Sequence, residues 1–411
     1  MSKKINASIL NLSKDFLLNI AATFLSTGSM QLVLYPQMAQ KLPAEEYGTM
    51  LTVIGIVNVI TLALGNNLCN ARLLDDKKYR DNNIRGDYPI LLLIMALFSA
   101  SLVLIANQYF RLDADILAGL LIYTVLNVVC SYSLVTFRIS INYTRNLIAH
   151  LFLCIGYVVG SIFLLGYLSW PWTFALAYGL GVIYIWFSSD ILREPFKITP
   201  FFRKTATSAG VLIVSGLIGN LTTYLDRFII HPILGGESVS VYATASFFVK
   251  SINLVLTPIL TVVLSYITKG KLNINRKRYQ IISLGYLIGG MLFIVVSVTI
   301  GKFITGFLYP TLIAQAEQYI LLTTCSISVG IIGSFMGIMV LAYAPRVWQI
   351  ISSSLKLGLY FILSVCLIRQ YGLYGMCTGV LITNSIIATL NYVVGYYFVS
   401  KKDKASLATT D

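Results

Sequence analysis

The chain has 411 residues, of which 57% are hydrophobic and only 11% are charged, and its mean hydropathy is +0.80. Because soluble domains carry about a quarter of charged residues, this composition excludes an ordinary soluble protein and indicates a polytopic membrane protein. The net charge is +14, but Lys and Arg lie mostly in short loops between apolar runs, which gives no support to nucleic-acid binding.

Apolar runs long enough to span a bilayer, which takes about 20 residues, recur along the whole chain. We expect the first run to be a retained span, since no small-residue cleavage site precedes a soluble domain. Six scattered cysteines and two distant histidines offer no metal-ligand spacing, so neither a metal site nor a cofactor is expected. The sequence predicts an all-α integral membrane protein with about twelve transmembrane helices at 15–36, 47–68, 89–107, 115–137, 147–168, 172–192, 207–231, 239–267, 280–301, 317–343, 348–368 and 373–399.

Positive charge is distributed unequally between the two sides of this topology. Of the 30 Lys and Arg residues, 23 lie on the side that holds both termini, four on the opposite side, and three within spans. Loops rich in Lys and Arg stay in the cytoplasm, so we predict that the N- and C-termini are cytoplasmic. The asymmetry accounts for most of the net charge, as a topology signal together with attraction to anionic lipids.

Two predicted outer loops resemble each other. "LPAEEYGTM" (42–50) and "LGGESVSVY" (234–242) both run from Leu through small residues and Glu to a Tyr that begins the next span. Glu45 and Glu237 are 192 residues apart, close to half of the chain. The alternative is chance similarity over nine residues. A duplication would give two six-helix lobes of the same orientation, 1–200 and 201–411, related by pseudo-symmetry around a central cavity.

Polar residues recur every three or four positions within the first, seventh and eighth spans, so each of these helices has one polar face. We expect these faces to line the cavity, although small polar residues also mediate packing between membrane helices. The members include Asp15, Asn19 and Thr23 in the first span, Asp226 in the seventh, and Lys250 and Asn253 in the eighth.

Charges within spans need a further reason, because each costs about 2.5–3.5 kcal/mol in hydrocarbon. Asp226 and Arg227 are adjacent, so their side chains point about 100° apart on a helix and do not face one another. We expect Asp226 to hold a cation, a proton or a basic partner such as Lys250. Arg227, Lys250 and mid-span Lys356 would form an anion site, unless Arg227 and Lys250 extend to the outer interface instead.

The stretch "YLDRFIIHPILGGESVSVY" (224–242) resembles the seventh-span signature of the polysaccharide repeat-unit flippases, in which an Asp and a basic residue precede a Leu-Gly loop and a Tyr. "LPAEEYGTM" looks like their first outer loop, and "RQYGLYGMCTGVLI" (369–382) like the start of their twelfth span. "TFRISINYTRN" (136–146) is similar to the stretch after their fourth span, where an Arg such as Arg138 is usual. The resemblance covers the whole chain in length and number of spans. This family belongs to the multidrug, oligosaccharidyl-lipid and polysaccharide exporter superfamily.

The resemblance implies a flippase, and not an enzyme, that moves an undecaprenyl-diphosphate-linked oligosaccharide across the bacterial inner membrane by alternating access. The product would serve O-antigen or other surface polysaccharide synthesis. The implied partners are this lipid-linked glycan, the bilayer, a polysaccharide polymerase and a chain-length regulator. The diphosphate needs cations in the cavity, for which Arg227, Lys250, Lys356 and Arg138 are the candidates, and Asp226 would act in coupling or in a charge pair.

Two alternatives remain open. A drug exporter of the same fold would favour carboxylates over cations in its cavity. A membrane enzyme could use "LLDDKKYRD" (73–81) as an Asp-rich loop that binds magnesium and a diphosphate. Such an enzyme needs a second acidic motif in a facing loop, which the sequence lacks, and a polymerase or ligase would need a large outer loop, whereas all outer connections here are short.

The charge asymmetry predicts which loops are accessible from outside the cell. Single cysteines at positions 41 and 302 should react with a membrane-impermeant maleimide in intact cells, whereas cysteines at 77 and 276 should react only after permeabilisation. The reverse pattern would show that the predicted orientation is inverted.

Overall fold

The computed structural model describes residues 2–82, 86–164, 166–268, 274–345 and 347–407. These residues form helices and no β-strand. Four of the cations that predict the topology, Arg85, Lys269, Lys271 and Arg346, lie outside the described residues. The helices of the first half are α1 (Ser2–Ser29), α2 (Tyr35–Lys41), α3 (Ala44–Thr61), α4 (Asn67–Asp81), α5 (Asp87–Phe110), α6 (Ala114–Ser133), α7 (Val135–Ile139), α8 (Tyr143–Val159) and α9 (Pro171–Ser188).

Three of these helices are extended by π-helical turns, and a short 3₁₀-helix follows α9. The turns are η1 (Met30–Leu34) between α1 and α2, η2 (Leu62–Asn66) between α3 and α4, and η3 (Gly160–Leu164) after α8, and the 3₁₀-helix is η4 (Ile191–Arg193). The second half contains four long helices, α10 (Phe202–Thr268), α11 (Arg276–Leu308), α12 (Ile313–Tyr343) and α13 (Val347–Leu407).

Nine helices of the described part are long and apolar enough to cross a membrane, and a bent pair within α10 adds a tenth. With 67 and 61 residues, α10 and α13 are each about 90–100 Å long, which is enough to cross a hydrocarbon core of about 30 Å twice. Each contains one residue outside the helical region, Gly235 in α10 and Gly372 in α13. Two passes in each give twelve in total, which confirms the predicted all-α membrane fold.

The turns inside α10 and α13 are tighter than predicted. The sequence predicts a loop over 234–242, but helix lies on both sides of Gly235, whose φ is +83°. Gly372, with φ +57°, separates the two parts of α13 in the same way. A glycine reaches the left-handed region without steric cost, so one residue replaces a loop at each of these positions.

The chain divides into two compact units. Unit 1 comprises Met1–Lys41 and Val53–Tyr224, and unit 2 comprises Leu42–Thr52 and Leu225–Asp411. The divisions fall between α2 and α3, within α3 and within α10, and the lobes 1–200 and 201–411 stay a prediction. The six-plus-six repeat stays a prediction.

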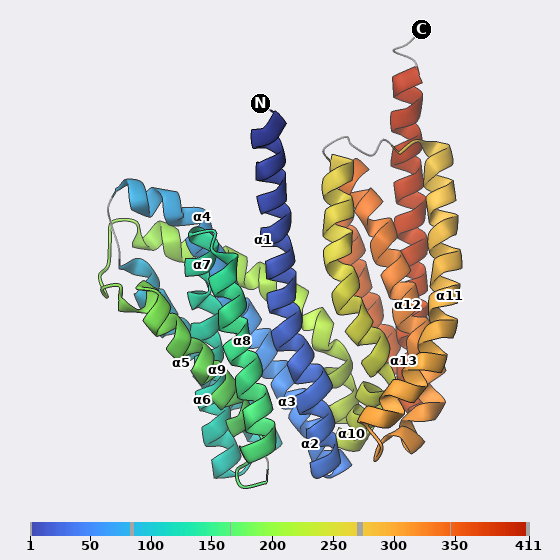
Figure 1. Ribbon diagram of the computed structural model, residues 1–411. Coiled ribbons are helices and arrows are strands. Elements are labelled where there is room, and N and C mark those ends of the chain that lie inside the picture. The colour runs from blue at the N-terminus through green and yellow to red at the C-terminus, as the bar shows by residue number, and fades with distance from the viewer. Residues whose placement is uncertain (1, 83–85, 165, 269–273, 346, 408–411) are drawn as a thin grey trace. The chain divides into compact units, whose positions relative to one another are not determined.

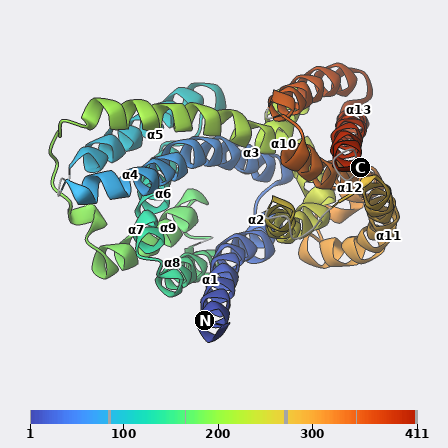
Figure 2. The same ribbon diagram turned by 90° about the horizontal axis from the view of Figure 1, so that it is seen from above.

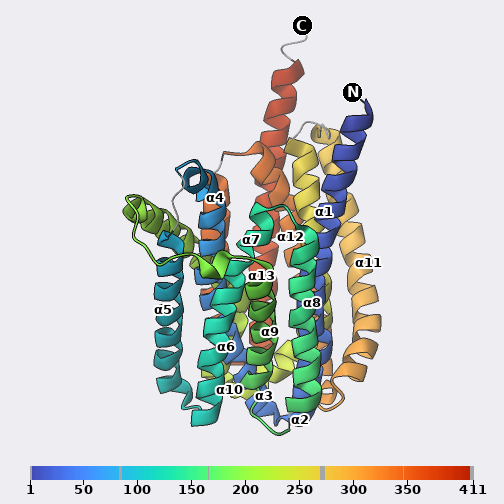
Figure 3. The ribbon, with the colours of Figure 1, turned by 60° about the vertical axis from the view of Figure 1, so that its left-hand side comes forward.

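Within unit 1, α1 packs on α8, α8 on α9, α9 on α6, and α6 on α5, and these helices run side by side in Figure 3. Within unit 2, α12 packs against both α11 and α13, which surround it in Figures 1 and 2. Large apolar side chains remain exposed on the outer helices, for example Met291, Val295 and Phe307 of α11. A bilayer would cover this surface, since monomeric soluble proteins rarely expose apolar patches of such extent.

The first turns of α3 touch α10 backbone to backbone within unit 2. A Cβ atom on Gly48 would lie 1.7 Å from the carbonyl oxygen of Gly236, and the Ser240 hydroxyl donates to the carbonyl of Ala44 at 2.5 Å. In the predicted repeat, equivalent positions are 192 residues apart, so Ala44 corresponds to Gly236 and Gly48 corresponds to Ser240. The contact of Gly48 with Gly236 is therefore equivalent to the contact of Ser240 with Ala44. A two-fold axis produces this kind of reciprocal contact.

Gly48 should therefore not tolerate a side chain. We expect Gly48→Ala to destabilise the folded protein by about 1–3 kcal/mol or more, because the new methyl group meets backbone that cannot rotate away. Melting in detergent solution measures the effect. The matched control is Gly289→Ala in α11, where a Cβ would meet nothing within 4 Å; equal melting temperatures for the two variants would contradict the close approach.

Candidate functional site

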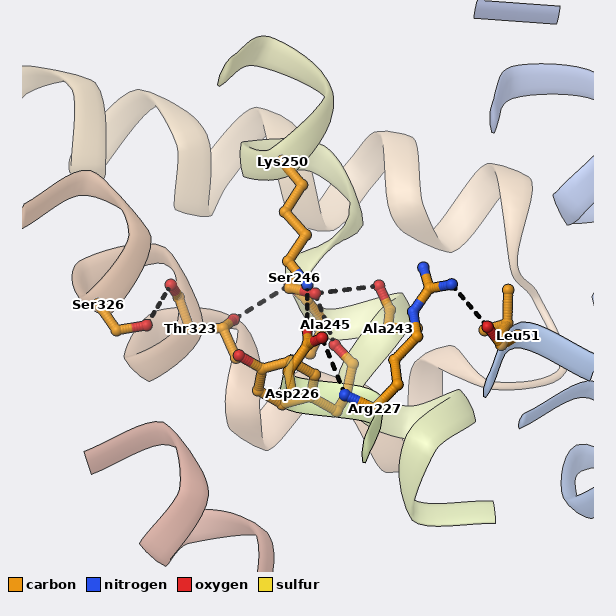
Figure 4. Close-up of polar contacts among 10 residues, drawn as sticks. Leu51, Asp226, Arg227, Ala243, Ala245, Ser246, Lys250, Thr323 and Ser326 are labelled. Carbon is orange, nitrogen blue, oxygen red and sulfur yellow. Dashed lines mark hydrogen bonds and ion pairs between the residues drawn. The ribbon is translucent and has the colours of Figure 1, made fainter. Parts of the chain in front are cut away.

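Asp226 is the most deeply buried of the charged residues that the sequence predicts within spans. Its carboxylate lies 2.5 Å from the Lys250 ammonium, and the two side chains are 5% and 37% exposed. Asp226 precedes the break at Gly235 and Lys250 follows it, so the return of α10 beyond this glycine brings the two groups together (Figure 4). The Lys250 ammonium also lies 5.1 Å from the centre of the Tyr242 ring, which adds a cation–π contact.

Arg227 points to a different partner. Its backbone N–H donates to the Asp226 carboxylate at 2.9 Å, whereas its guanidinium donates to the carbonyl oxygen of Leu51 in α3 at 2.7 Å. In Figure 4 the Arg227 side chain extends toward Leu51, and the carboxylate of Asp226 meets Lys250. The divergence follows from the 100° step between adjacent residues of a helix. Arg227 thus joins α10 to the part of α3 that belongs to unit 2.

A second acidic residue holds the start of α3 against α10. The Glu45 carboxylate accepts the backbone N–H groups of Gly236 at 2.9 Å and Glu237 at 2.7 Å. These N–H groups follow the break at Gly235, where the next helical segment begins and its first donors have no partner within the helix. A carboxylate there also interacts favourably with the positive end of the helix dipole. The sequence marks Glu45 and Glu237 as a repeated motif, but it does not show that the two loops touch.

Lys356 lines a polar cavity of about 260 Å³ between α12 and both parts of α13. The Ser352 hydroxyl donates to the Asn391 side chain at 2.9 Å, and the amide groups of Asn384 and Asn391 donate to backbone carbonyls of α12. The Lys356 ammonium has neither an ion pair nor a hydrogen bond to any of the described residues. An ammonium within a membrane pass and next to a polar cavity is the most favourable position for an anion among the predicted site residues of unit 2.

The site residues predicted in the first half lie in unit 1. Arg138 of α7 is half-buried and donates to the Asn70 side chain at 3.0 Å and to the Cys69 sulfur at 3.3 Å. On α1, Asn19 accepts from the Asn146 amide at 3.3 Å. The Thr23 hydroxyl donates to the Asn19 carbonyl at 3.1 Å, and Asp15 is half-buried. Asn253 is half-buried on α10 in unit 2. A common cavity lined by all these residues stays a prediction.

The Asp-rich stretch 73–81 forms the last turns of α4. Asp75 accepts from the Tyr88 hydroxyl at 3.0 Å, and Asp76 pairs with Arg80. In the part of the chain that the structure describes, no group of three or more His, Cys, Asp or Glu side chains could hold a metal ion. The two carboxylates are thus engaged with neighbouring side chains, which does not favour the magnesium loop of a membrane enzyme.

Solved structures of membrane transporters share this fold over nearly the whole chain. The lipid II flippase MurJ in an inward closed conformation matches with a TM-score of 0.71 and 14% identity, over 96% of this chain and 92% of that chain. A multidrug resistance MATE family transporter of the MOP superfamily, in an inward-facing conformation, matches with a TM-score of 0.63 and 14% identity, over 97% and 99%. MATE in complex with MaD3S matches with a TM-score of 0.60 and 12% identity, over 96% of each chain. No family model and no curated protein matches the sequence.

At these identities the likeness concerns the fold alone. The chain is a multi-pass membrane protein with the architecture of MurJ and the MATE transporters. The sequence resemblance to the polysaccharide repeat-unit flippases is compatible with this fold and is not decided by it, because two kinds of transporter with different cargo share the architecture.

The ion pair of Asp226 and Lys250 should show coupling between its members. Removing one partner of a buried ion pair costs about 3–5 kcal/mol, because the other charge stays buried. Asp226 is far less exposed than Lys250, so Lys250→Met should lower the melting temperature more than Asp226→Asn, and the double variant should recover most of the loss. A double-mutant cycle of melting temperatures in detergent measures the coupling.

The matched control is the exposed pair of Lys302 and Glu317, whose side chains are 53% and 51% exposed. Lys302→Met and Glu317→Gln should cost less than about 1 kcal/mol together, as exposed pairs do. Additive losses for Asp226 and Lys250, equal in size to those of the control pair, would contradict a buried interaction.

Proposed function

We propose that the protein is a flippase that carries an undecaprenyl-diphosphate-linked oligosaccharide from the cytoplasmic to the outer leaflet of the bacterial inner membrane. The oligosaccharide would be the repeat unit of O-antigen or of another surface polysaccharide, which a polymerase and a chain-length regulator then extend. The lipid tail stays in the bilayer while the sugar and the diphosphate cross through the protein. The fold shared with MurJ and the MATE transporters supports a transporter of this architecture.

The observation that carries the proposal is that, in the described part of the chain, the charge without a counter-ion within the membrane passes of unit 2 is positive. Asp226 is neutralised by Lys250, whereas Lys356 lines a polar cavity without a counter-ion among the described residues. A cation in such a position carries an uncompensated desolvation cost. A bound anion would offset this cost, so the cavity favours an anionic cargo. The diphosphate of a lipid-linked sugar carries this charge, whereas the sugar itself is neutral or weakly charged.

In this proposal the remaining candidate residues have distinct tasks. Lys356 contacts the diphosphate. Arg227 and Lys250 receive it when the protein opens outward, which requires Lys250 to leave Asp226 and would couple the release of cargo to protonation or cation binding at Asp226. Arg138 contributes a cation from unit 1. Asp15, Asn19, Thr23 and Asn253 offer hydrogen bonds to sugar hydroxyls.

Export of small drug molecules is the second candidate. It is favoured by the fold shared with the MATE transporters, which matches this chain as completely as the MurJ fold does. A carrier of cationic drugs needs a carboxylate that is accessible to its cargo. Such a carrier would use Asp226 after Lys250 has moved away.

Lys356 separates the two candidates. We expect Lys356→Ala to slow translocation of an undecaprenyl-diphosphate-linked glycan in proteoliposomes about tenfold or more at low glycan concentration, because the loss of one charged contact lowers anion affinity by about this factor. Lys356→Arg should retain part of the activity, since it keeps the charge. The readout is protection of the fluorescently labelled glycan from an enzyme added outside the vesicles.

Lys302→Ala is the matched control, because Lys302 is an exposed lysine whose ion pair with Glu317 lies outside the cavity. If Lys356→Ala inserts and translocates the glycan at the wild-type rate, the flippase proposal loses its main support. If the wild-type protein instead exports a cationic dye and moves no glycan, drug export is the function.

A further inference from the structure

Unit 1 contains a large polar cleft that the proposed flippase mechanism does not use. Its volume is about 630 Å³, and it lies between α4, α7, the start of α8, the end of α9 and η4. Ligand pockets typically measure about 300–1,000 Å³, so the cleft is large enough for a small molecule or a lipid headgroup. Three arginines, Arg72, Arg80 and Arg145, line it. The charge asymmetry of the sequence predicts that this end of unit 1 is cytoplasmic.

Arg72 is buried with unused hydrogen-bonding capacity. Its side chain is 6% exposed, and Nη2 donates to Glu194 at 2.7 Å, whereas Nε and Nη1 have no hydrogen-bond partner among the described residues. The guanidinium carbon lies 4.9 Å from the centre of the Tyr88 ring and 5.5 Å from that of Tyr79, so aromatic faces hold it in place. Leaving a buried charged donor unsatisfied is unfavourable, and a ligand with acceptor oxygens would remove this cost.

The acidic residues of the cleft do not oppose an anion. Glu194 pairs with Arg72, Asp76 with Arg80, and Asp190 with Arg193, so each carboxylate has its own arginine. Arg145 is the remaining cation of the lining. It is exposed, it donates to the backbone carbonyl of Ser188 at 3.1 Å, and it has no ion pair within the described part of the chain. Arg193 balances Asp190 from outside the lining, so among the described residues Arg145 is the cation of the cleft without an ion pair, and two buried N–H groups of Arg72 have no partner.

We propose that this cleft of unit 1 binds a phosphate group, with the guanidinium groups of Arg72 and Arg145 as its donors. Arginine is suited to this task because its planar guanidinium presents several N–H groups to the oxygens of one phosphate. The phosphate comes either from a soluble compound or from the headgroup of an anionic phospholipid in the same leaflet. The site is separate from the cavity at Lys356, which belongs to unit 2.

Purified protein in a neutral detergent tests the site with two probes. One arm titrates inorganic diphosphate by isothermal calorimetry, and the other counts phosphatidylglycerol adducts by native mass spectrometry against phosphatidylcholine. Arg145→Gln should weaken binding about tenfold, the size expected for one charge-assisted hydrogen bond, and it should fold normally because Arg145 is exposed. Arg72→Lys, which keeps the ion pair with Glu194 but loses the other donors, should weaken binding similarly.

Arg203→Gln is the matched control, since Arg203 is an exposed arginine on α10 that does not line the cleft. Binding of diphosphate alone assigns a soluble ligand, and binding of phosphatidylglycerol alone assigns a lipid headgroup. Either result supports the proposal if Arg145→Gln weakens the binding and Arg203→Gln does not. Absence of binding in both arms, or equal losses in the two variants, overturns it. Both arms are repeated in the Lys356→Ala background, in which diphosphate no longer has the cation of the unit 2 cavity to bind. Binding in that background that Arg145→Gln weakens belongs to the cleft, so a failure of the flippase proposal is recognised separately.

Discussion

A carboxylate that is 5% exposed within a membrane pass imposes the arrangement of unit 2. Asp226 cannot be solvated by hydrocarbon, so a cation has to reach it, and Lys250 does so only because α10 reverses at Gly235. Nine residues separate Asp226 from the break and fifteen separate the break from Lys250, which corresponds to rises of about 14 and 22 Å. The long side chain of Lys250 covers much of the difference. The tight turn, the polar face of the returning segment and the ion pair thus depend on one another.

Much of the fold follows from sequence because the bilayer constrains local patterns strongly. Apolar runs of the required length mark the passes, and glycines such as Gly235 and Gly372 mark where the chain turns. The sequence could not predict that α10 and α13 are each interrupted at one residue only. A stretch that contains glycine is compatible both with a loop of several residues and with a turn at a single glycine of positive φ. The contact of Gly48 with Gly236 also has no local signature. It joins segments almost 190 residues apart, and only the repeated Glu45 and Glu237 motifs indicate that the two segments are related.

The candidate site was less predictable than the fold, because a charge in a span shows that a partner is needed without showing which one. The sequence groups Arg227, Lys250 and Lys356 as one set of cations. The structure gives them three environments, namely the carbonyl of Leu51, the carboxylate of Asp226 and a polar cavity. The 100° step between Asp226 and Arg227 predicts their divergence but not its targets. The buried pair of Arg72 and Glu194 was missed, since both residues fall between the predicted spans, where the sequence gives no sign of a buried partner.

The same architecture occurs in the lipid II flippase MurJ and in multidrug resistance MATE transporters, so the fold alone does not select the cargo. Selection has to come from the sign and the accessibility of charge within the passes. In this chain the Lys250 ammonium occupies the position that a cationic cargo or a coupling cation would take at Asp226. A cation could compete for that carboxylate only by displacing a tethered ammonium, whose effective concentration is high because it lies on the same helix. Lys250 thus balances the charge of Asp226, and Lys356 has no counter-ion among the described residues. This arrangement supports the proposal that the transported group is an anion.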